Sequence, residues 1–168
     1  MERMNRDEYF SELALLVARR ATCARRSVGC VFISARGHIL STGYNGVPRG
    51  HTHCIDVRCP GAALPSGTGL DICEAIHAEQ NALLQCKDVE AIDTAYVTLL
   101  PCMTCMKLLL NTGCKRIVYA AEYPHQEAKQ LWIKNGRIII STAEALSKPA
   151  VSKAHSYRLR DARPELND

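Results

Sequence analysis

The sequence has few aromatic residues, no long apolar run and no concentrated basic stripe. Phe, Trp and Tyr make up 5% of the 168 residues, so aliphatic side chains must build most of the core. No run is long and apolar enough to cross a bilayer. The net charge of +4 is mild and suits phosphorylated ligands, but it is not the clustered basic surface typical of proteins that bind duplexes.

The amino terminus, MERMNRDEYF, has no apolar stretch followed by a small-residue cleavage site. We therefore expect a cytoplasmic protein, in the host cytoplasm if its origin is viral. Disulfides are disfavoured in a reducing compartment, yet the chain has nine cysteines. Metal binding is the better explanation for cysteines that cluster, and the odd number argues against complete pairing.

Hydrophobic periodicity and turn residues predict one α/β domain over residues 1–146, followed by a polar tail over 147–168. A helix over 7–21 precedes two strands that flank the turn at 35–37. After a long insert, helices and strands alternate, which indicates a three-layer α/β/α sandwich around a mixed sheet. The later elements are expected at 74–86 (helix), 94–100 (strand), 101–110 (helix), 116–121 (strand), 126–134 (helix) and 137–141 (strand).

Two short segments carry a catalytic pattern, His77-Ala78-Glu79 and Pro101-Cys102-Met103-Thr104-Cys105. The two cysteines open a predicted helix three residues apart, so their sulfurs can face one point, and the helix dipole favours thiolates there. With His77 as a third ligand, one tetrahedral position stays open for water, as in catalytic zinc sites. Glu79 is not needed as a ligand and can move protons. The combination resembles the signature of zinc deaminases.

A second metal site is predicted in and around the insert at 45–73, which is too long for an ordinary loop. Its ligands would be four thiolates that fix the insert to the core, with His53 as an alternative ligand. Buried free thiols are the competing interpretation. The four candidates are Cys23, Cys54, Cys59 and Cys73, whereas Cys30, Cys86 and Cys114 lie in predicted strand or helix positions and are expected to pack in the core.

The chain resembles the bacterial and phage deoxycytidylate (dCMP) deaminases of the cytidine-deaminase-like superfamily. The resemblance rests on segments between about residues 20 and 125: ATCARRSVGCV, STGYNGVPRGHTHC, CEAIHAEQNALLQ, YVTLLPCMTC and IVYAAEYPH. It implies a five-stranded mixed sheet and the conversion of dCMP to dUMP, a precursor for thymidylate synthesis. It also implies substrate contacts from Arg26, Asn45, Ala78 and Tyr123.

The resemblance further implies a homohexamer that dCTP with Mg²⁺ activates and dTTP inhibits. Asn45, Gly46 and Arg49 match the loop at that regulatory site. Cys23 and Cys54 match ligands of a second zinc in phage relatives, whereas Cys59 and Cys73 fall where relatives use other ligands. The Gly-Tyr-Asn-Gly motif is equally compatible with a simple turn, and Arg25-Arg26 with a solvated charge pair.

Two other functions use the same motifs. The zinc chemistry also suits dCTP, free nucleosides, or adenine or cytosine in tRNA and other polynucleotides, but polynucleotide enzymes typically have a basic channel with stacking aromatics. A non-catalytic zinc-binding module is the other alternative. Glu79 argues against it, because a structural zinc site needs no proton shuttle beside it.

Overall fold

The computed structural model describes residues 3–65, 67–124 and 126–147 of the chain. None of its helices within these residues is long and apolar enough to cross a membrane. The elements in chain order are α1 (Arg6–Ala18), β1 (Gly29–Ile33), β2 (Ile39–Tyr44), α2 (Ala78–Gln85), β3 (Thr94–Leu99), α3 (Met103–Leu110), β4 (Arg116–Ala121), α4 (Glu127–Lys134), β5 (Ile138–Ser141) and α5 (Thr142–Ser147).

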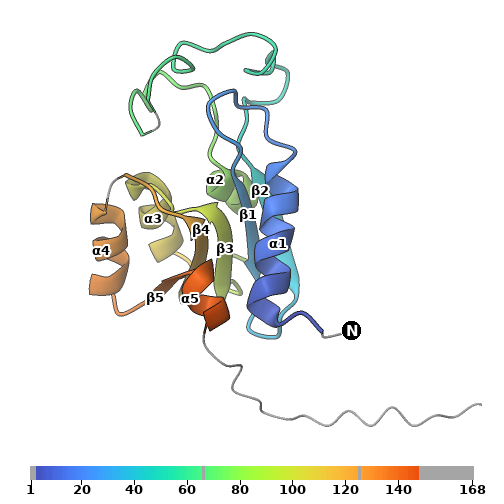
Figure 1. The fold of residues 1–168 in the computed structure, drawn as a ribbon, viewed down its shortest axis with the longest axis vertical. Coiled ribbons are helices and arrows are strands. Elements are labelled where there is room, and N and C mark those ends of the chain that lie inside the picture. Colours follow the sequence, from blue (N-terminus) through green and yellow to red (C-terminus); the bar gives the residue numbers. More distant parts are fainter. Residues whose placement is uncertain (1–2, 66, 125, 148–168) are drawn as a thin grey trace, which may run out of the picture.

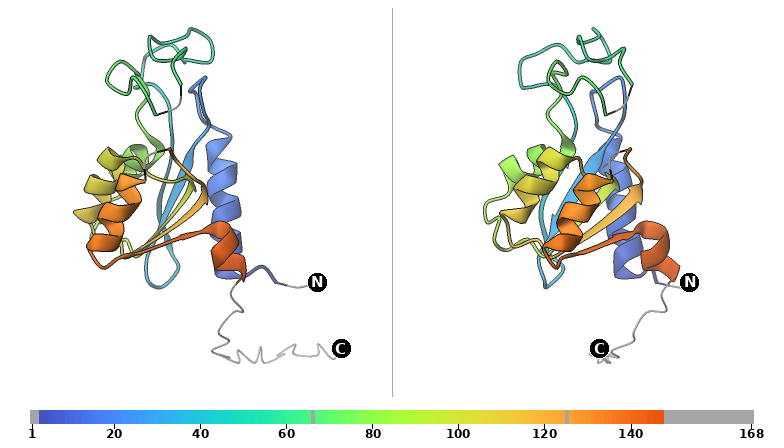
Figure 2. Two further views of the ribbon diagram at one scale, coloured as in Figure 1. Left: turned by 60° about the vertical axis from the view of Figure 1, so that its left-hand side comes forward. Right: turned by 90° about the vertical axis from the view of Figure 1, so that its left-hand side faces the viewer.

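The strands form one sheet in the order β2-β1-β3-β4-β5 (Figure 1). β1 pairs antiparallel with β2 and β3, whereas β3, β4 and β5 are parallel. α1 and α5 pack on one face of the sheet, and α2, α3 and α4 cover the other (Figure 2). The three-layer sandwich around a five-stranded mixed sheet is therefore confirmed.

Each face of the sheet has its own core, and the few aromatic residues are concentrated there. Trp132, Tyr119 and Phe32 lie with aliphatic residues between the sheet and α2, α3 and α4. Phe10 and Tyr96 lie in the core beneath α1, with their ring centroids 5.2 Å apart. A small set of aromatics thus contributes to both cores, although aliphatic side chains make up most of each.

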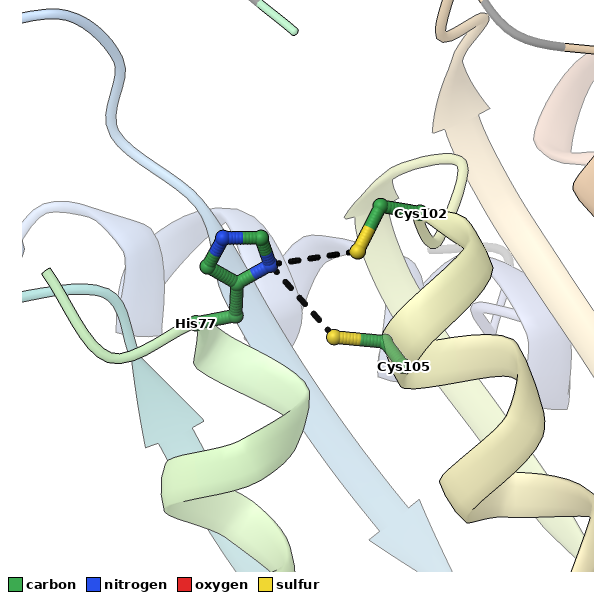
Figure 3. Close-up of side chains that lie close together, drawn as sticks. All are labelled: His77, Cys102 and Cys105. Atoms are coloured by element: carbon green, nitrogen blue, oxygen red, sulfur yellow. Dashed lines mark hydrogen bonds between the residues drawn. The ribbon is translucent and has the colours of Figure 1, made fainter. Parts of the chain in front are cut away.

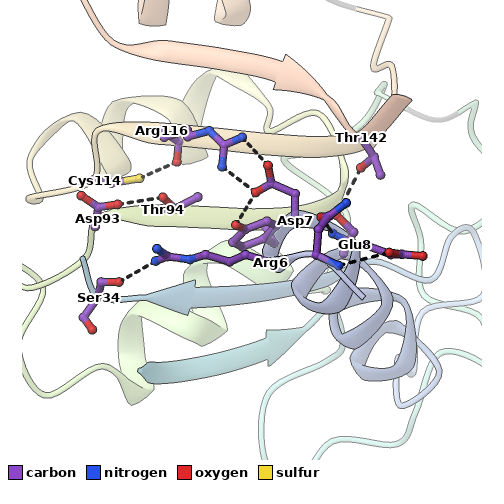
Figure 4. Close-up of polar contacts among 12 residues, drawn as sticks. Arg6, Asp7, Glu8, Ser34, Asp93, Thr94, Cys114, Arg116 and Thr142 are labelled. Carbon is purple, nitrogen blue, oxygen red and sulfur yellow. Dashed lines mark hydrogen bonds and ion pairs between the residues drawn. The ribbon is translucent and has the colours of Figure 1, made fainter. Parts of the chain in front are cut away.

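α1 is held to the sheet by a partly buried ion pair between Asp7 and Arg116 of β4 (Figure 4). The Arg116 guanidinium donates to both carboxylate oxygens at 2.7 and 2.8 Å, and the Tyr96 hydroxyl donates to the same carboxylate at 2.6 Å. Burial acts to raise the pKa of Asp7, but these donors outweigh it and hold the pKa below its usual value.

Two predicted helices begin later than expected. The helix predicted over 74–86 begins at Ala78, because Ile76 forms an isolated bridge with Gly46 that keeps the preceding backbone extended. The helix that Pro101 was expected to open begins at Met103, since Cys102 is its extended N-cap residue (φ −69°, ψ 170°).

Some side-chain and terminal predictions also differ. Leu16 of α1 and Leu84 of α2 are 58% and 77% exposed, although each lies in a helix whose apolar periodicity predicted burial of one face. α5 was not expected and follows β5 directly. Cys30 and Cys114 are fully buried, as expected, and Cys86 packs against the same core from its edge. Except for Ser147, the predicted tail lies outside the described residues.

The insert at 45–73 has no helix or strand of its own among its described residues and lies beyond one end of the sheet, together with the loop that joins α1 to β1 (Figure 1). α2 and α3 both begin at this end of the molecule (Figure 1). The arrangement brings the insert, the α1–β1 loop and two helix N-termini to one place.

Candidate metal centre

The candidate metal ligands lie where two helices begin (Figure 3). His77 is the N-cap residue of α2, and Cys102 and Cys105 occupy the N-cap and first turn of α3. The positive end of each helix dipole therefore points toward the site. His77 is 25 and 28 residues away from the two cysteines in the sequence. The packing of α2 and α3 on one face of the sheet brings the three predicted ligands together.

The geometry of this group fits zinc. The Nδ1 atom of His77 lies 3.4 Å from each of the Cys102 and Cys105 sulfurs. A nitrogen and a sulfur bound tetrahedrally to one zinc, at roughly 2.05 and 2.3 Å, lie about 3.5 Å apart. Within the described residues, this is the one group of three or more potential ligand atoms that all lie within 4.8 Å of one another.

The two cysteines differ in charge state because they share a hydrogen bond. That bond, with a smaller contribution from His77, lowers the pKa of Cys102 to about 4. The same bond raises the pKa of Cys105, and burial adds to the increase. The hydrogen bond with Cys102 also raises the pKa of His77. Coordination to a cation deprotonates a thiol outright, so both cysteines can serve as thiolate ligands.

Glu79 lies in the first turn of α2 and is 4% exposed. Burial raises the pKa of its carboxyl to about 7, although its backbone contact and the neighbouring His77 act in the opposite direction. A carboxyl with a pKa near neutrality can both accept and give a proton at physiological pH. This is the property that a proton shuttle beside a metal requires.

The Gly-Tyr-Asn-Gly motif positions α2. Gly46 and Ile76 exchange two backbone hydrogen bonds of 3.1 and 2.9 Å, immediately before His77. The Asn81 side chain on α2 donates to the Tyr44 carbonyl at 2.8 Å. Gly43 lies so close to α2 that an added Cβ would stand 2.2 Å from the Ala78 carbonyl oxygen. The motif therefore does more than turn the chain.

A pocket that is partly open to solvent adjoins the candidate ligands. His77, Cys102 and Glu79 line it. The four residues expected to contact substrate also line it, namely Arg26, Asn45, Ala78 and Tyr123. The polar groups of this pocket converge on an otherwise largely apolar surface, which is typical of small-molecule sites.

The Asn45 side chain already holds the segment before β1. Its Oδ1 atom accepts a hydrogen bond from the Val28 backbone N–H at 2.8 Å, and its Nδ2 atom donates to the Arg26 carbonyl at 2.8 Å. Asn45 thus shapes the backbone that carries Arg26, a role that the sequence pattern did not reveal. The Asn45 Oδ1 atom can still accept one further hydrogen bond, and its Nδ2 atom can still donate one, from the pocket side.

The residues predicted for regulation differ in their exposure. Asn45 and Gly46 are buried and make the contacts described above, whereas Arg49 is exposed and does not line the pocket. An added Cβ on Gly46 would lie 2.3 Å from the Thr22 hydroxyl oxygen, which explains the glycine on packing grounds alone.

The four insert-associated cysteines are near one another in the fold, but only two of their sulfurs are in contact. The Cys54 and Cys59 sulfurs lie 3.6 Å apart. The residues next to Cys54 and Cys23 are joined by a hydrogen bond from the Ile55 N–H to the Thr22 carbonyl at 3.2 Å. An added Cβ on Gly61 would lie 2.9 Å from the Cα and Cβ atoms of Cys73. His53, the alternative ligand, is exposed beside Asp56.

Sequence reasoning missed two sets of residues around the pocket. Arg25 lines it beside Arg26, as do Gly67 and Leu70 of the insert. In addition, the Tyr119 hydroxyl lies 2.5 Å from the Glu122 carboxylate and 2.6 Å from the Lys129 ammonium. Glu122 immediately precedes Tyr123 of the pocket. No local motif marks these contacts, because they join segments that are distant in sequence or depend on the bend after β4.

Comparison with protein families supports the geometry. Residues 4–121 match the family model described as the cytidine and deoxycytidylate deaminase zinc-binding region. The chain belongs to this family. A His, Cys, Cys group with zinc-like spacing in a zinc-binding family supports zinc as its metal.

Individual relatives confirm the resemblance to deoxycytidylate deaminases. The chain is 40% identical over 130 residues to the deoxycytidylate deaminase of Mycobacterium phage D29, covering 73% of this chain and 99% of that protein. It is 42% identical over 122 residues to the Schizosaccharomyces pombe enzyme, covering 70% of this chain and 37% of the relative. The match spans between about a third and a half of the length of the yeast relatives.

A solved structure shows the same fold. The crystal structure of dCMP deaminase from the cyanophage S-TIM5, in complex with dCMP and dUMP, superposes with a TM-score of 0.68 at 27% identity. The alignment covers 84% of this chain and 99% of the cyanophage chain. The agreement therefore extends over nearly the whole of a protein that binds a pyrimidine deoxynucleotide.

Proposed function

We propose that this protein is a zinc-dependent deaminase that hydrolyses dCMP to dUMP and ammonia. The observation that carries the proposal is the group of His77, Cys102 and Cys105 at zinc-like spacing, with Glu79 buried beside it in the same pocket. The substrate is proposed from the phage relative of nearly full coverage and from the ligands named for the cyanophage structure.

In this mechanism His77, Cys102 and Cys105 hold the metal. A bound zinc lowers the pKa of a water molecule, so that a nucleophile is available near neutral pH. Glu79 accepts a proton from the attacking water and gives it to the ring nitrogen next to the reacting carbon. Glu79 then takes the second proton from the hydroxyl now on that carbon and gives it to the amine as the C–N bond breaks, so that dCMP and water yield dUMP and ammonia. Its pKa of about 7 suits both directions of transfer.

The pocket residues have separate tasks in the proposal. Tyr123, 6% exposed, forms part of the wall against which the base or sugar packs. Asn45 orients the sugar with the hydrogen-bonding capacity that its backbone contacts leave. The Arg26 side chain is exposed at the pocket and makes no hydrogen bond with the described residues. Its guanidinium can therefore bind the phosphate through two donors.

A structural zinc held by the insert is part of the same proposal. It is supported by the contact between Cys54 and Cys59 and by the closeness of their neighbours to Cys23 and Cys73. The insert has little regular structure with which to hold itself, and a tetrahedral site of four thiolates would fix it to the core. One catalytic and one structural zinc per chain is the resulting stoichiometry.

Regulation and assembly are proposed from the family resemblance. On this basis the protein is a cytoplasmic homohexamer that supplies thymidylate synthesis, is activated by dCTP with Mg²⁺ and is inhibited by dTTP. Arg49 is the exposed cation of the predicted regulatory loop. Its replacement by Met should abolish both responses without changing basal activity, if that loop binds the triphosphates.

The substrate is tested by measuring ammonia release from dCMP, dCTP, deoxycytidine, CMP and a cytosine-containing oligonucleotide, using zinc-loaded protein. A preference for dCMP is expected. Activity on the nucleoside or the oligonucleotide instead would retain the zinc chemistry and refute the substrate. No release from any of them, with zinc bound, would favour another amino-substituted base or a non-catalytic zinc module.

A further inference from the structure

Two adjacent arginines at the pocket have different surroundings. The Arg26 side chain is exposed and makes no hydrogen bond with the described residues, whereas Arg25 is half-buried. The Arg25 guanidinium donates to the carbonyl oxygen of Pro65 and, at 3.0 Å, to that of Thr68. Both acceptors belong to the insert, about forty residues further along the chain. Arg25 therefore connects the segment before β1 to the insert.

Its two acceptors belong to a compact turn. The Thr68 hydroxyl donates to the Pro65 carbonyl at 2.7 Å, and the Thr68 backbone N–H reaches the same oxygen at 3.1 Å. Gly67 has a φ of +86°, a conformation that side-chain-bearing residues rarely adopt. The turn is thus closed on itself and presents two carbonyl oxygens to a single guanidinium.

The segment around this turn has few other connections to the protein. All other hydrogen bonds of residues 60–72 with described partners are made to residues of the insert itself. The two bonds from Arg25 are therefore the ones that join this segment to residues beyond the insert, as far as the described residues extend. A charge-assisted hydrogen bond is roughly twice as strong as a neutral one, so this single side chain has a large effect on the segment.

The segment also forms part of the pocket. Gly67 and Leu70 line it together with Arg25 and with the residues at the start of α2. Leu70 is 41% exposed, so its position depends on the insert backbone more than on packing in a core. Displacement of the turn would remove one wall of the pocket and leave the metal centre intact.

We propose that Arg25 is a positioning residue that fixes the insert as the outer wall of the substrate pocket. Arg26 remains available for the phosphate. Arg25 then sets the affinity for the substrate without touching it, and the irregular insert acts as a specificity element of the site. This role rests on the proposed deaminase function, but the attachment of the insert by Arg25 can be measured independently.

The test compares Arg25→Met, Arg25→Lys, Arg26→Met and, as a matched control, Arg36→Met at an exposed turn. KM and kcat for dCMP are measured together with the rate at which chymotrypsin cleaves after Leu70, since the Leu64–Pro65 bond resists this protease. Arg25→Met should raise KM about tenfold, leave kcat within about twofold, and accelerate cleavage of the insert about fivefold or more. Arg25→Lys should lie between wild type and Arg25→Met, since an ammonium group can still reach one carbonyl.

Arg26→Met should raise KM without changing cleavage, and Arg36→Met should change neither. The proposal is overturned if Arg25→Met raises KM while cleavage of the insert stays at the wild-type rate, because Arg25 would then bind substrate directly. It is equally overturned if neither quantity changes. If wild-type protein does not act on dCMP but Arg25→Met accelerates cleavage, the proposed function fails and the attachment of the insert by Arg25 stands.

Discussion

The two cysteine-bearing regions of this protein are built in different ways. Cys102 and Cys105 lie at the start of a helix that packs against the sheet, and their sulfurs and His77 are already at zinc-like spacing. The insert cysteines lie on irregular backbone, and only Cys54 and Cys59 have sulfurs in contact. The first site is organised by the packing of α2 and α3 on the sheet, whereas the proposed second site would depend on its metal for its final geometry.

The difference has a physical cause, namely how much regular secondary structure and apolar core surround each region. Around the first site, helices and strands satisfy most backbone groups and leave the side chains free to converge. Around the second, exposed apolar residues such as Ile55 and Val57, at 53% and 63% exposure, show how little core the insert has. Loss of a metal should therefore affect chemistry in one region and structure in the other.

The largest expected effect is at the first site. Replacing Cys102 by Ser removes a thiolate ligand, which should cost several kcal/mol of transition-state stabilisation and reduce kcat/KM roughly 10³-fold or more. The melting temperature should change little, because α3 and the sheet do not depend on the metal. Zinc analysis measures the metal content, an ammonia-release assay measures kcat/KM, and calorimetry measures the melting temperature. A large loss of stability would contradict the idea that the fold organises this site.

The insert should respond in the opposite way. Replacing Cys54 by Ser should remove roughly one zinc per chain, lower the melting temperature by several degrees, and reduce kcat/KM only about tenfold. Zinc content and calorimetry provide the readout. Cys86→Ser is the control, because this thiol is partly buried but belongs to neither group. Unchanged zinc content in the Cys54 variant would show that the insert cysteines are ordinary buried thiols.

These predictions mark the difference between what local sequence patterns reveal and what they do not. His77, Glu79, Cys102 and Cys105 were identifiable because the spacing of each motif is local, and because the strands and helices that present them have clear periodicity. The bridge between Gly46 and Ile76 shortened a predicted helix, and no local pattern encodes a contact between residues thirty apart.

The same limit explains the pocket. Arg25 and Arg26 are adjacent residues of the same type, so the sequence does not distinguish them. The path of the insert in space gives Arg25 its hydrogen-bond partners there. The dual use of the Asn45 amide on residues 26 and 28 likewise depends on the path of the chain in space. α5 was missed because six residues are too few to show an amphipathic period.

The smallest expected effect on activity concerns the framework far from both regions. Asp7→Asn leaves Arg116 without its carboxylate partner and should cost about 2 kcal/mol of stability, or roughly 4–8 °C in melting temperature. kcat/KM at 25 °C should stay within about twofold. Glu12→Gln, on the exposed side of α1, is the control and should leave the melting temperature unchanged.

The pH dependence of this effect follows from the lowered pKa of Asp7. The folded protein binds the proton of Asp7 more weakly than the unfolded chain does. The advantage of the wild type over Asp7→Asn is therefore fully present above the pKa of the unfolded state and is lost as the pH falls through the folded-state value. Thermal melts at several pH values check it, and an advantage that grew on acidification would contradict the assignment.

The most direct test of the account is the Glu79→Gln variant, measured for zinc content and for ammonia release from dCMP in the same preparation. Glu79 is proposed to move protons and not to bind the metal. The variant should therefore retain the zinc content of the wild type and lose about 10²- to 10⁴-fold in kcat. Full activity with zinc bound would contradict the proposed mechanism, and loss of zinc would show that Glu79 supports the metal centre itself.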